Sequence, residues 1–177
     1  MKTYSKTLFL LFLSLIFTSC VWGQDVRLSQ KGSVTQYIND TEEITIVYNR
    51  PVARGRTLFG RDGIVGYGRI WMPGANEASV IEFSTDVLLN GHEVKEGRYS
   101  IWTIPGSEEW TFILNNTADV WHTNYPEGDD AVRFQVKSEK GGYIEAMTFY
   151  FAVVEPGEAT LHLQWGETIV PVDIRID

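Results

Sequence analysis

The chain has 177 residues, of which 44% are hydrophobic and 21% are charged, and its formal net charge is −8 at pH 7. This apolar content is typical of a globular protein and excludes a chain that is disordered throughout. The acidic balance argues against nucleic-acid binding, because the neutralisation of phosphates needs a basic surface.

The N-terminal segment has the features of a secretion signal. Lys2 and Lys6 precede an apolar run from Leu8 to Phe17. This run is about half of the ~20 apolar residues that a membrane-spanning helix needs, and its flanks are those of a secretory signal. Residues 1–23 are therefore predicted to be a cleavable signal peptide. Residues 24–177 are predicted to be a single exported domain that works in the periplasm or outside the cell.

Two maturation routes fit this segment. Val21-Trp22-Gly23 provides acceptable residues for signal peptidase, which would leave Gln24 as the first residue of the mature chain. Alternatively, Cys20 becomes the first residue and carries a lipid, which would make the product an outer-membrane lipoprotein. The chain contacts a membrane only on this second route. Cys20 is the only cysteine, so both routes exclude a disulfide framework and a thiol nucleophile in the mature protein.

Strand patterns recur through the rest of the chain, rich in Val, Ile, Thr and aromatic residues. Asn39-Asp40 and Asn90-Gly91 supply hairpin turns between them. No window reads as an amphipathic helix of about ten residues or more. The expected strands are 33–38, 43–48, 78–83, 87–89, 92–94, 98–104, 110–114, 131–137, 143–154, 159–165 and 169–176.

This even spacing predicts an all-β fold. We expect an antiparallel two-sheet β-sandwich, jelly-roll-like, with about 8–11 strands. Gly166-Glu167 is interpreted as a tight turn between the last two strands. Pro171 lies in the closing strand and lacks the N–H that a ladder needs, so that strand is predicted to be at an edge or bulged there.

One long segment, residues 50–77, breaks the strand rhythm and is rich in Arg and Gly. Five arginines stand there against Asp62 and Glu77, a net charge of +3. The remainder of the chain from Gln24 on has 8 basic and 21 acidic residues, a net charge of −13. A loop of this length in a compact domain is usually functional or locally structured. Its basic cluster needs a counter-charge, either from the protein or from a ligand.

Polar residues of this loop are the candidate binding site. Arg50 and Arg56 offer planar guanidinium groups that match carboxylates, phosphates and sugar hydroxyls. Asn76 and Glu77 supply further donors and acceptors, and Trp71 is a candidate apolar wall. The alternative interpretation is structural, in which an Arg–Glu pair pins the loop to the sheet.

The sequence gives less support to a catalytic function. Glu77 is a candidate general acid or base with Glu82 or Asp62 as its partner, since glycoside hydrolysis needs two carboxylates. Glu77 and Glu82 are separated by an odd number of residues, which favours opposite faces of one strand. The three histidines, His92, His122 and His162, have no metal-ligand spacing. No cofactor or metal is predicted.

The loop and its neighbours resemble a known family. They are similar to domain-of-unknown-function family 2911, whose members are exported proteins of Bacteroidota-type bacteria. The resemblance covers nearly all of the mature chain and implies a secreted or envelope β-sandwich without an assigned reaction. It is carried by Tyr48-Asn49-Arg50-Pro51, Gly55-Arg56, Leu58-Phe59-Gly60, Tyr67-Gly68, Ile70-Trp71, Gly74-Ala75-Asn76-Glu77-Ala78, Glu96-Gly97-Arg98-Tyr99-Ser100, Ile104-Pro105-Gly106 and Glu109-Trp110-Thr111.

The chain departs from the family pattern at Trp71-Met72-Pro73-Gly74. Relatives more often have a basic and a hydroxyl residue between the Trp and the Gly. If that basic residue contacts a ligand in the relatives, the resemblance implies that this member binds it less well or binds something different.

Three functional hypotheses follow. The first is a non-catalytic binding module of the cell envelope for a carbohydrate or small anionic ligand, with Arg50, Arg56, Trp71, Asn76 and Glu77 as contacts. The second is a hydrolase that uses Glu77 as general acid or base. The third is a structural or assembly protein whose basic loop docks on an acidic partner.

Overall fold

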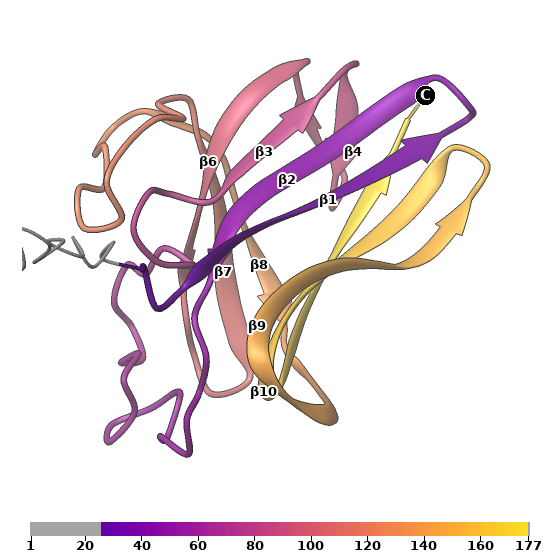
Figure 1. Cartoon of the computed structure of the whole chain (residues 1–177). Coiled ribbons are helices and arrows are strands. Elements are labelled where there is room, and N and C mark those ends of the chain that lie inside the picture. The colour runs from indigo at the N-terminus through magenta and orange to yellow at the C-terminus, as the bar shows by residue number, and fades with distance from the viewer. Residues whose placement is uncertain (1–25, 177) are drawn as a thin grey trace, which may run out of the picture.

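The computed structural model describes residues 26–176, which fold into two antiparallel sheets packed face to face (Figure 1). This stretch contains no helix, and the predicted all-β sandwich class is confirmed. Nothing between residues 26 and 176 therefore forms a helix suited to crossing a bilayer. The predicted signal peptide and Cys20 lie outside the described residues.

The larger sheet has six strands in the order β1-β2-β3-β6-β7-β8. Its first hairpin has a continuous register from Gln30 opposite Arg50 to Ile38 opposite Glu42. The strands are β1 (Gln30–Ile38), β2 (Glu42–Arg50), β3 (Val80–Phe83), β6 (Gly97–Ile104), β7 (Glu109–Asn115) and β8 (Asp130–Lys137).

The smaller sheet has four strands in the order β5-β4-β10-β9. Its short hairpin turns at Asn90-Gly91, where both residues have positive φ, 48° and 82°, as a two-residue hairpin turn requires. The strands are β4 (Val87–Leu89), β5 (His92–Val94), β9 (Glu139–Glu155) and β10 (Glu158–Arg175).

The core lies between the sheets and follows the period-two alternation of the strands. Ile44 and Ile46 of β2 are fully buried, as are Leu161 and Leu163 of β10 on the opposite sheet. His162 lies between those two leucines and points to the outer face, as the sequence predicts. The strand pattern therefore decides which residues reach the core.

The C-terminal strand differs from the prediction. The structure has one strand, β10, where the sequence predicts two strands with a turn at Gly166-Glu167. Gly166 has a φ of 59° and is flanked by register shifts against β9, so this turn is wrong and the site is a β-bulge. Pro171 falls between the part of β10 paired with β9 and the part paired with β4, so its missing N–H interrupts neither ladder.

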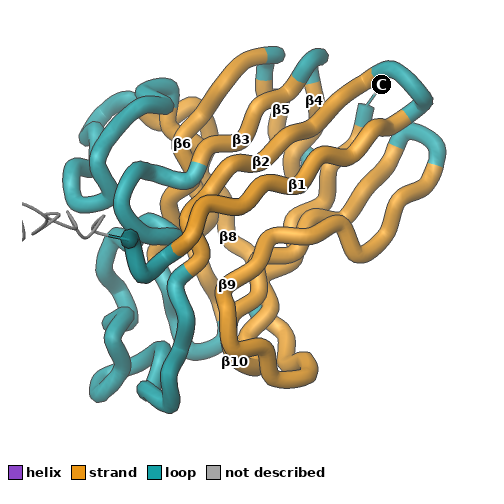
Figure 2. Tube along the Cα trace, viewed as in Figure 1, coloured by secondary structure: helices purple, strands orange, loops and turns teal. Residues whose placement is uncertain are grey.

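The long segment between β2 and β3 is held against the sandwich at both of its ends (Figure 2). Isolated bridges join Val52 to Ala146 of β9 and Trp71 to Thr103 of β6. Ala53 and Met72 are buried, so the segment contributes to the core. It is thus a structured cover over one end of the two sheets.

Candidate functional site

A cavity of about 490 Å³ lies against this cover. Its size is within the ~300–1,000 Å³ range of small-molecule sites. Of the residues that line it, Trp165 of β10 alone belongs to a strand, and the others come from segments between or before the strands. These segments are 28–29, 51–56, 64–65, 71–76 and His122.

Two tryptophans form the apolar wall of the cavity. Trp71 and Trp165 stack with ring centroids 6.1 Å apart and an interplanar angle of 12°. The Trp165 indole N–H donates to the carbonyl of Glu145 at 3.2 Å. Trp71 exchanges two backbone hydrogen bonds of 2.8 Å with Thr103. The Trp165 ring is therefore held through its N–H, and the Trp71 ring packs edge-on against Phe59 and Trp110, with centroids 5.7 and 6.1 Å away.

Arg54 and Arg56 reach the cavity from a tight turn. The Arg56 N–H donates to the Ala53 carbonyl at 3.1 Å, and the two central residues, Arg54 and Gly55, have φ of 53° and 70°. This is the pattern of a type I′ turn, which favours Asn, Asp or Gly at both central positions. An arginine in this left-handed conformation is strained.

The two guanidinium groups differ in their internal bonds. That of Arg56 donates to the carbonyls of Ala53 and Val52, at 2.8 and 2.6 Å. Among the described residues, the guanidinium of Arg54 makes no hydrogen bond, and neither group has a carboxylate within 4 Å. Arg56 therefore braces the turn, and Arg54 is free to meet a ligand.

An acidic group beside this turn belongs to Glu145 on β9. Its carboxylate accepts the Arg54 backbone N–H at 2.5 Å and the Tyr143 hydroxyl at 2.8 Å. These two hydrogen bonds, helped by the charges of Arg54 and Arg56, hold the pKa of Glu145 below its ordinary value. The cavity lining itself contains two arginines and neither Asp nor Glu. It is a locally positive site in an acidic protein.

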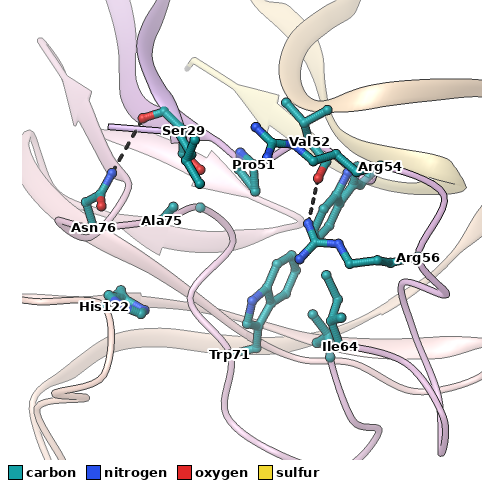
Figure 3. A pocket seen from close by; sticks show the side chains of 14 residues that line it. Ser29, Pro51, Val52, Arg54, Arg56, Ile64, Trp71, Ala75, Asn76 and His122 are labelled. Carbon is teal, nitrogen blue, oxygen red and sulfur yellow. Dashed lines mark hydrogen bonds between the residues drawn. The ribbon is translucent and has the colours of Figure 1, made fainter. Parts of the chain in front are cut away.

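The other end of the cavity is bordered by the polar residues Asn76 and His122 (Figure 3). Asn76 has a φ of 63°, and its carbonyl accepts the His122 backbone N–H at 3.0 Å. Its side-chain amide lies 3.5 Å from the carbonyl of Ser29, a long contact. In the view of Figure 3, Asn76 and His122 border one end of the cavity, and Arg54, Arg56 and Ile64 border the other.

Arg50 lies outside this cavity. It leaves the end of β2 and reaches across to β9, where its guanidinium donates to the Met147 carbonyl at 3.2 Å and to the Thr148 hydroxyl at 2.6 Å. Its side chain also packs tightly against Gly32 of β1. These contacts give Arg50 a role in joining the two sheets.

Glu77 is also separate from the cavity lining. Arg27 donates to both of its carboxylate oxygens at 2.6 Å, and Asn49 donates to one of them at 3.2 Å. The bond from Arg27 is the largest cause that lowers the pKa of Glu77 below its ordinary value. A general acid at neutral pH needs a raised pKa, so these partners do not favour that role.

Glu77 and Glu82 line one depression of about 270 Å³ on the outer face of the larger sheet. The expectation that they lie on opposite faces is therefore wrong. Glu77 precedes β3, which begins at Val80, so the strand alternation does not extend to it. Arg98 lies between Glu82 and Asp119, at 3.5 and 3.3 Å.

The structure thus brings Arg56, Trp71 and Asn76 together and leaves Arg50 and Glu77 elsewhere. It adds Arg54, Trp165 and His122 to the cavity. A signal for Arg54 is present in the sequence, because Arg-Gly stands where Asn-Gly is usual in a type I′ turn. Within residues 26–176, no group of three or more His, Cys, Asp or Glu side chains is arranged to hold a metal ion.

Fold and site together define an antiparallel β-sandwich with a cavity at its loop-covered end. The family model described as "Protein of unknown function (DUF2911)" matches residues 29–174, so the chain belongs to this family. The resemblance stated from the sequence motifs is confirmed. No curated protein and no solved structure shows a significant match to the chain.

Proposed function

We propose that the protein is a non-catalytic binding module of the cell envelope that takes a carbohydrate or a small anionic ligand. The observation that supports this best is the cavity of about 490 Å³, with two stacked tryptophans and two arginines in a lining free of carboxylates. Concave sites with an apolar wall and a few convergent polar groups are the usual form of small-ligand sites.

The chemistry of the lining supports both ligand classes. Guanidinium groups bind carboxylates, phosphates and sulfates through planar, charge-assisted hydrogen bonds. The Trp71 indole, partly exposed in the cavity, offers a flat apolar surface. The Asn76 amide adds a donor and an acceptor for hydroxyl groups. Arg56, Trp71 and Asn76 are the contacts retained from the sequence hypothesis.

Export is the second part of the proposal. It rests on the charged n-region and apolar run within residues 1–23. Intact-mass analysis of the protein from the periplasm and the culture medium tests it. We expect a chain that begins at Gln24. A lipid adduct on Cys20 would instead assign the protein to a membrane surface, and uncleaved residues 1–23 would refute export through this signal.

Binding is tested with a glycan and metabolite screen on the purified protein, read by calorimetry and tryptophan fluorescence. The variant Ala75→Phe fills the cavity beside Asn76. We expect it to abolish binding of the screened ligand while the melting temperature stays nearly unchanged. Arg61→Ala is the control, because Arg61 is an exposed residue of the same segment outside the cavity. Unchanged affinity in Ala75→Phe would place the ligand elsewhere and refute the cavity as the site.

A further inference from the structure

We propose that the ligand is an acidic saccharide, with its anionic group on Arg54 and Arg56 and a sugar ring on Trp71. This inference rests on the proposed function of the cavity and narrows it to ligands that carry both features at once. The anionic group can be a carboxylate, a phosphate or a sulfate, since all three match the guanidinium fork.

The conformation of Arg54 is the first step. It has a φ of 53°, a region that costs roughly 1–2 kcal/mol for a residue other than glycine. Within residues 26–176, its guanidinium makes no ion pair and no hydrogen bond that would offset this cost. The charged side chain nevertheless lines the cavity. A ligand anion accounts for an arginine held at this strained position.

The distribution of charge is the second step. Arg54 and Arg56 leave the same turn, and Glu145, the nearby carboxylate, is engaged by the Arg54 backbone and by Tyr143. The Arg56 guanidinium uses Nε and one terminal nitrogen for its internal bonds. Its other terminal nitrogen has no partner among the described residues, and both arginines line the cavity. One anionic group at this end of the cavity supplies the counter-charge for both guanidinium groups.

The third step is the order of the lining groups along the cavity. Trp71 lies between the arginine end and the Asn76 end in the view of Figure 3. A free inorganic anion would occupy one end and leave the indole and the amide unused. A saccharide with an acidic substituent covers the indole, places hydroxyl groups near Asn76, and reaches the arginines with its charge.

The test uses matched pairs of probes on the intact protein. Digalacturonate is compared with neutral digalactose, glucose 6-phosphate with glucose, and sulfate is measured alone. Affinities come from calorimetry at low and at physiological salt. We expect an acidic sugar to bind about tenfold or more tightly than its neutral twin. We also expect its affinity to fall as salt rises, because the charges are partly exposed.

Two pairs of variants test the geometry. Ile64→Glu places a negative charge on the exposed rim beside the arginines, and Ile64→Gln has the same size without the charge. We expect Ile64→Glu to lose the preference for the acidic twin and Ile64→Gln to keep it. Arg54→Gly should lose the same preference without loss of thermal stability, whereas Arg61→Ala should bind as the wild type does.

The outcomes separate the two proposals. Equal affinity for acidic and neutral twins, or equal loss in Ile64→Glu and Ile64→Gln, overturns the acidic saccharide and leaves the binding module in place. Sulfate that binds as tightly as every acidic sugar overturns the saccharide part. A protein that binds none of these probes but binds another compound of the wider screen in this cavity also overturns the inference alone. Failure of every compound refutes the proposed function itself.

Discussion

Replacement of Arg50 by Met should destabilise the fold and leave ligand binding in the cavity unchanged. Met keeps most of the aliphatic stem beside Gly32 but removes the hydrogen bonds to the Met147 carbonyl and the Thr148 hydroxyl. A hydrogen bond from a charged donor contributes about 1.5–3 kcal/mol, and a buried acceptor that loses its partner costs about 1–3 kcal/mol. We therefore expect a loss of about 3 kcal/mol in the free energy of unfolding.

This loss corresponds to a fall of about 6–12 °C in melting temperature, since 1 kcal/mol shifts a domain of this size by about 2–4 °C. Circular dichroism or calorimetry measures it. Arg61→Met is the control, because Arg61 is exposed and makes no ion pair within residues 26–176, and surface changes of this kind stay within about 0.5 kcal/mol. A fall in Arg50→Met no larger than in the control would refute the view that Arg50 joins the sheets.

Three further predictions concern separate parts of the molecule. The lowered pKa of Glu77 means that its pair with Arg27 stabilises the fold above the ordinary glutamate pKa and loses this effect as the pH falls through the lowered value. The difference in melting temperature between wild type and Glu77→Gln should therefore shrink with acidification, and a constant difference would contradict this. Gly91→Ala should lower the melting temperature by about 2–8 °C, because φ is 82° there and a left-handed residue other than glycine costs roughly 1–2 kcal/mol. Gly142→Ala, which also has open space but no positive φ, should be neutral, and equal effects would argue against backbone strain. Burial lowers the pKa of His162, whose Nδ1 lies 3.1 Å from the Tyr150 hydroxyl, so its NMR titration should have a midpoint below that of a free imidazole, and a midpoint at or above it would refute the burial argument.

The sequence predicts the fold well because the local signals agree with each other. Asn90-Gly91 fixes a hairpin by its backbone requirement, and the alternation around His162 identifies the core face of its strand. The predicted tight turn at Gly166-Glu167 is wrong, and the reason is physical. Glycine with positive φ occurs in tight turns and in β-bulges, and the choice between them depends on whether β9 continues as a partner on the far side. That is a non-local fact, which no window of residues contains.

The site is predicted only in part for a similar reason. Composition identifies the basic loop, and its motifs point to Arg56, Trp71 and Asn76. Whether an arginine side chain bonds to the protein or faces open space depends on what lies across from it. Arg50 meets the edge of β9, nearly a hundred residues later in the chain. Trp165 belongs to a strand pattern and is buried, yet it contributes to the cavity lining.

The three arginines between residues 50 and 56 differ in their bonds within the protein, and the proposed binding role falls to the one whose guanidinium has none. Arg50 donates both of its side-chain hydrogen bonds to β9, and Arg56 donates two side-chain hydrogen bonds to carbonyls of its own turn. Arg50 therefore ties the start of the segment to the second sheet, and Arg56 braces the turn that carries Arg54. The charge of Arg54 is left without an ion pair within residues 26–176. A cation on a hydrogen-bonded backbone turn, with no internal partner for its guanidinium, breaks no protein bond when it binds an anion. The structural role of its neighbours is therefore the condition under which the strained residue can act as the recognition element.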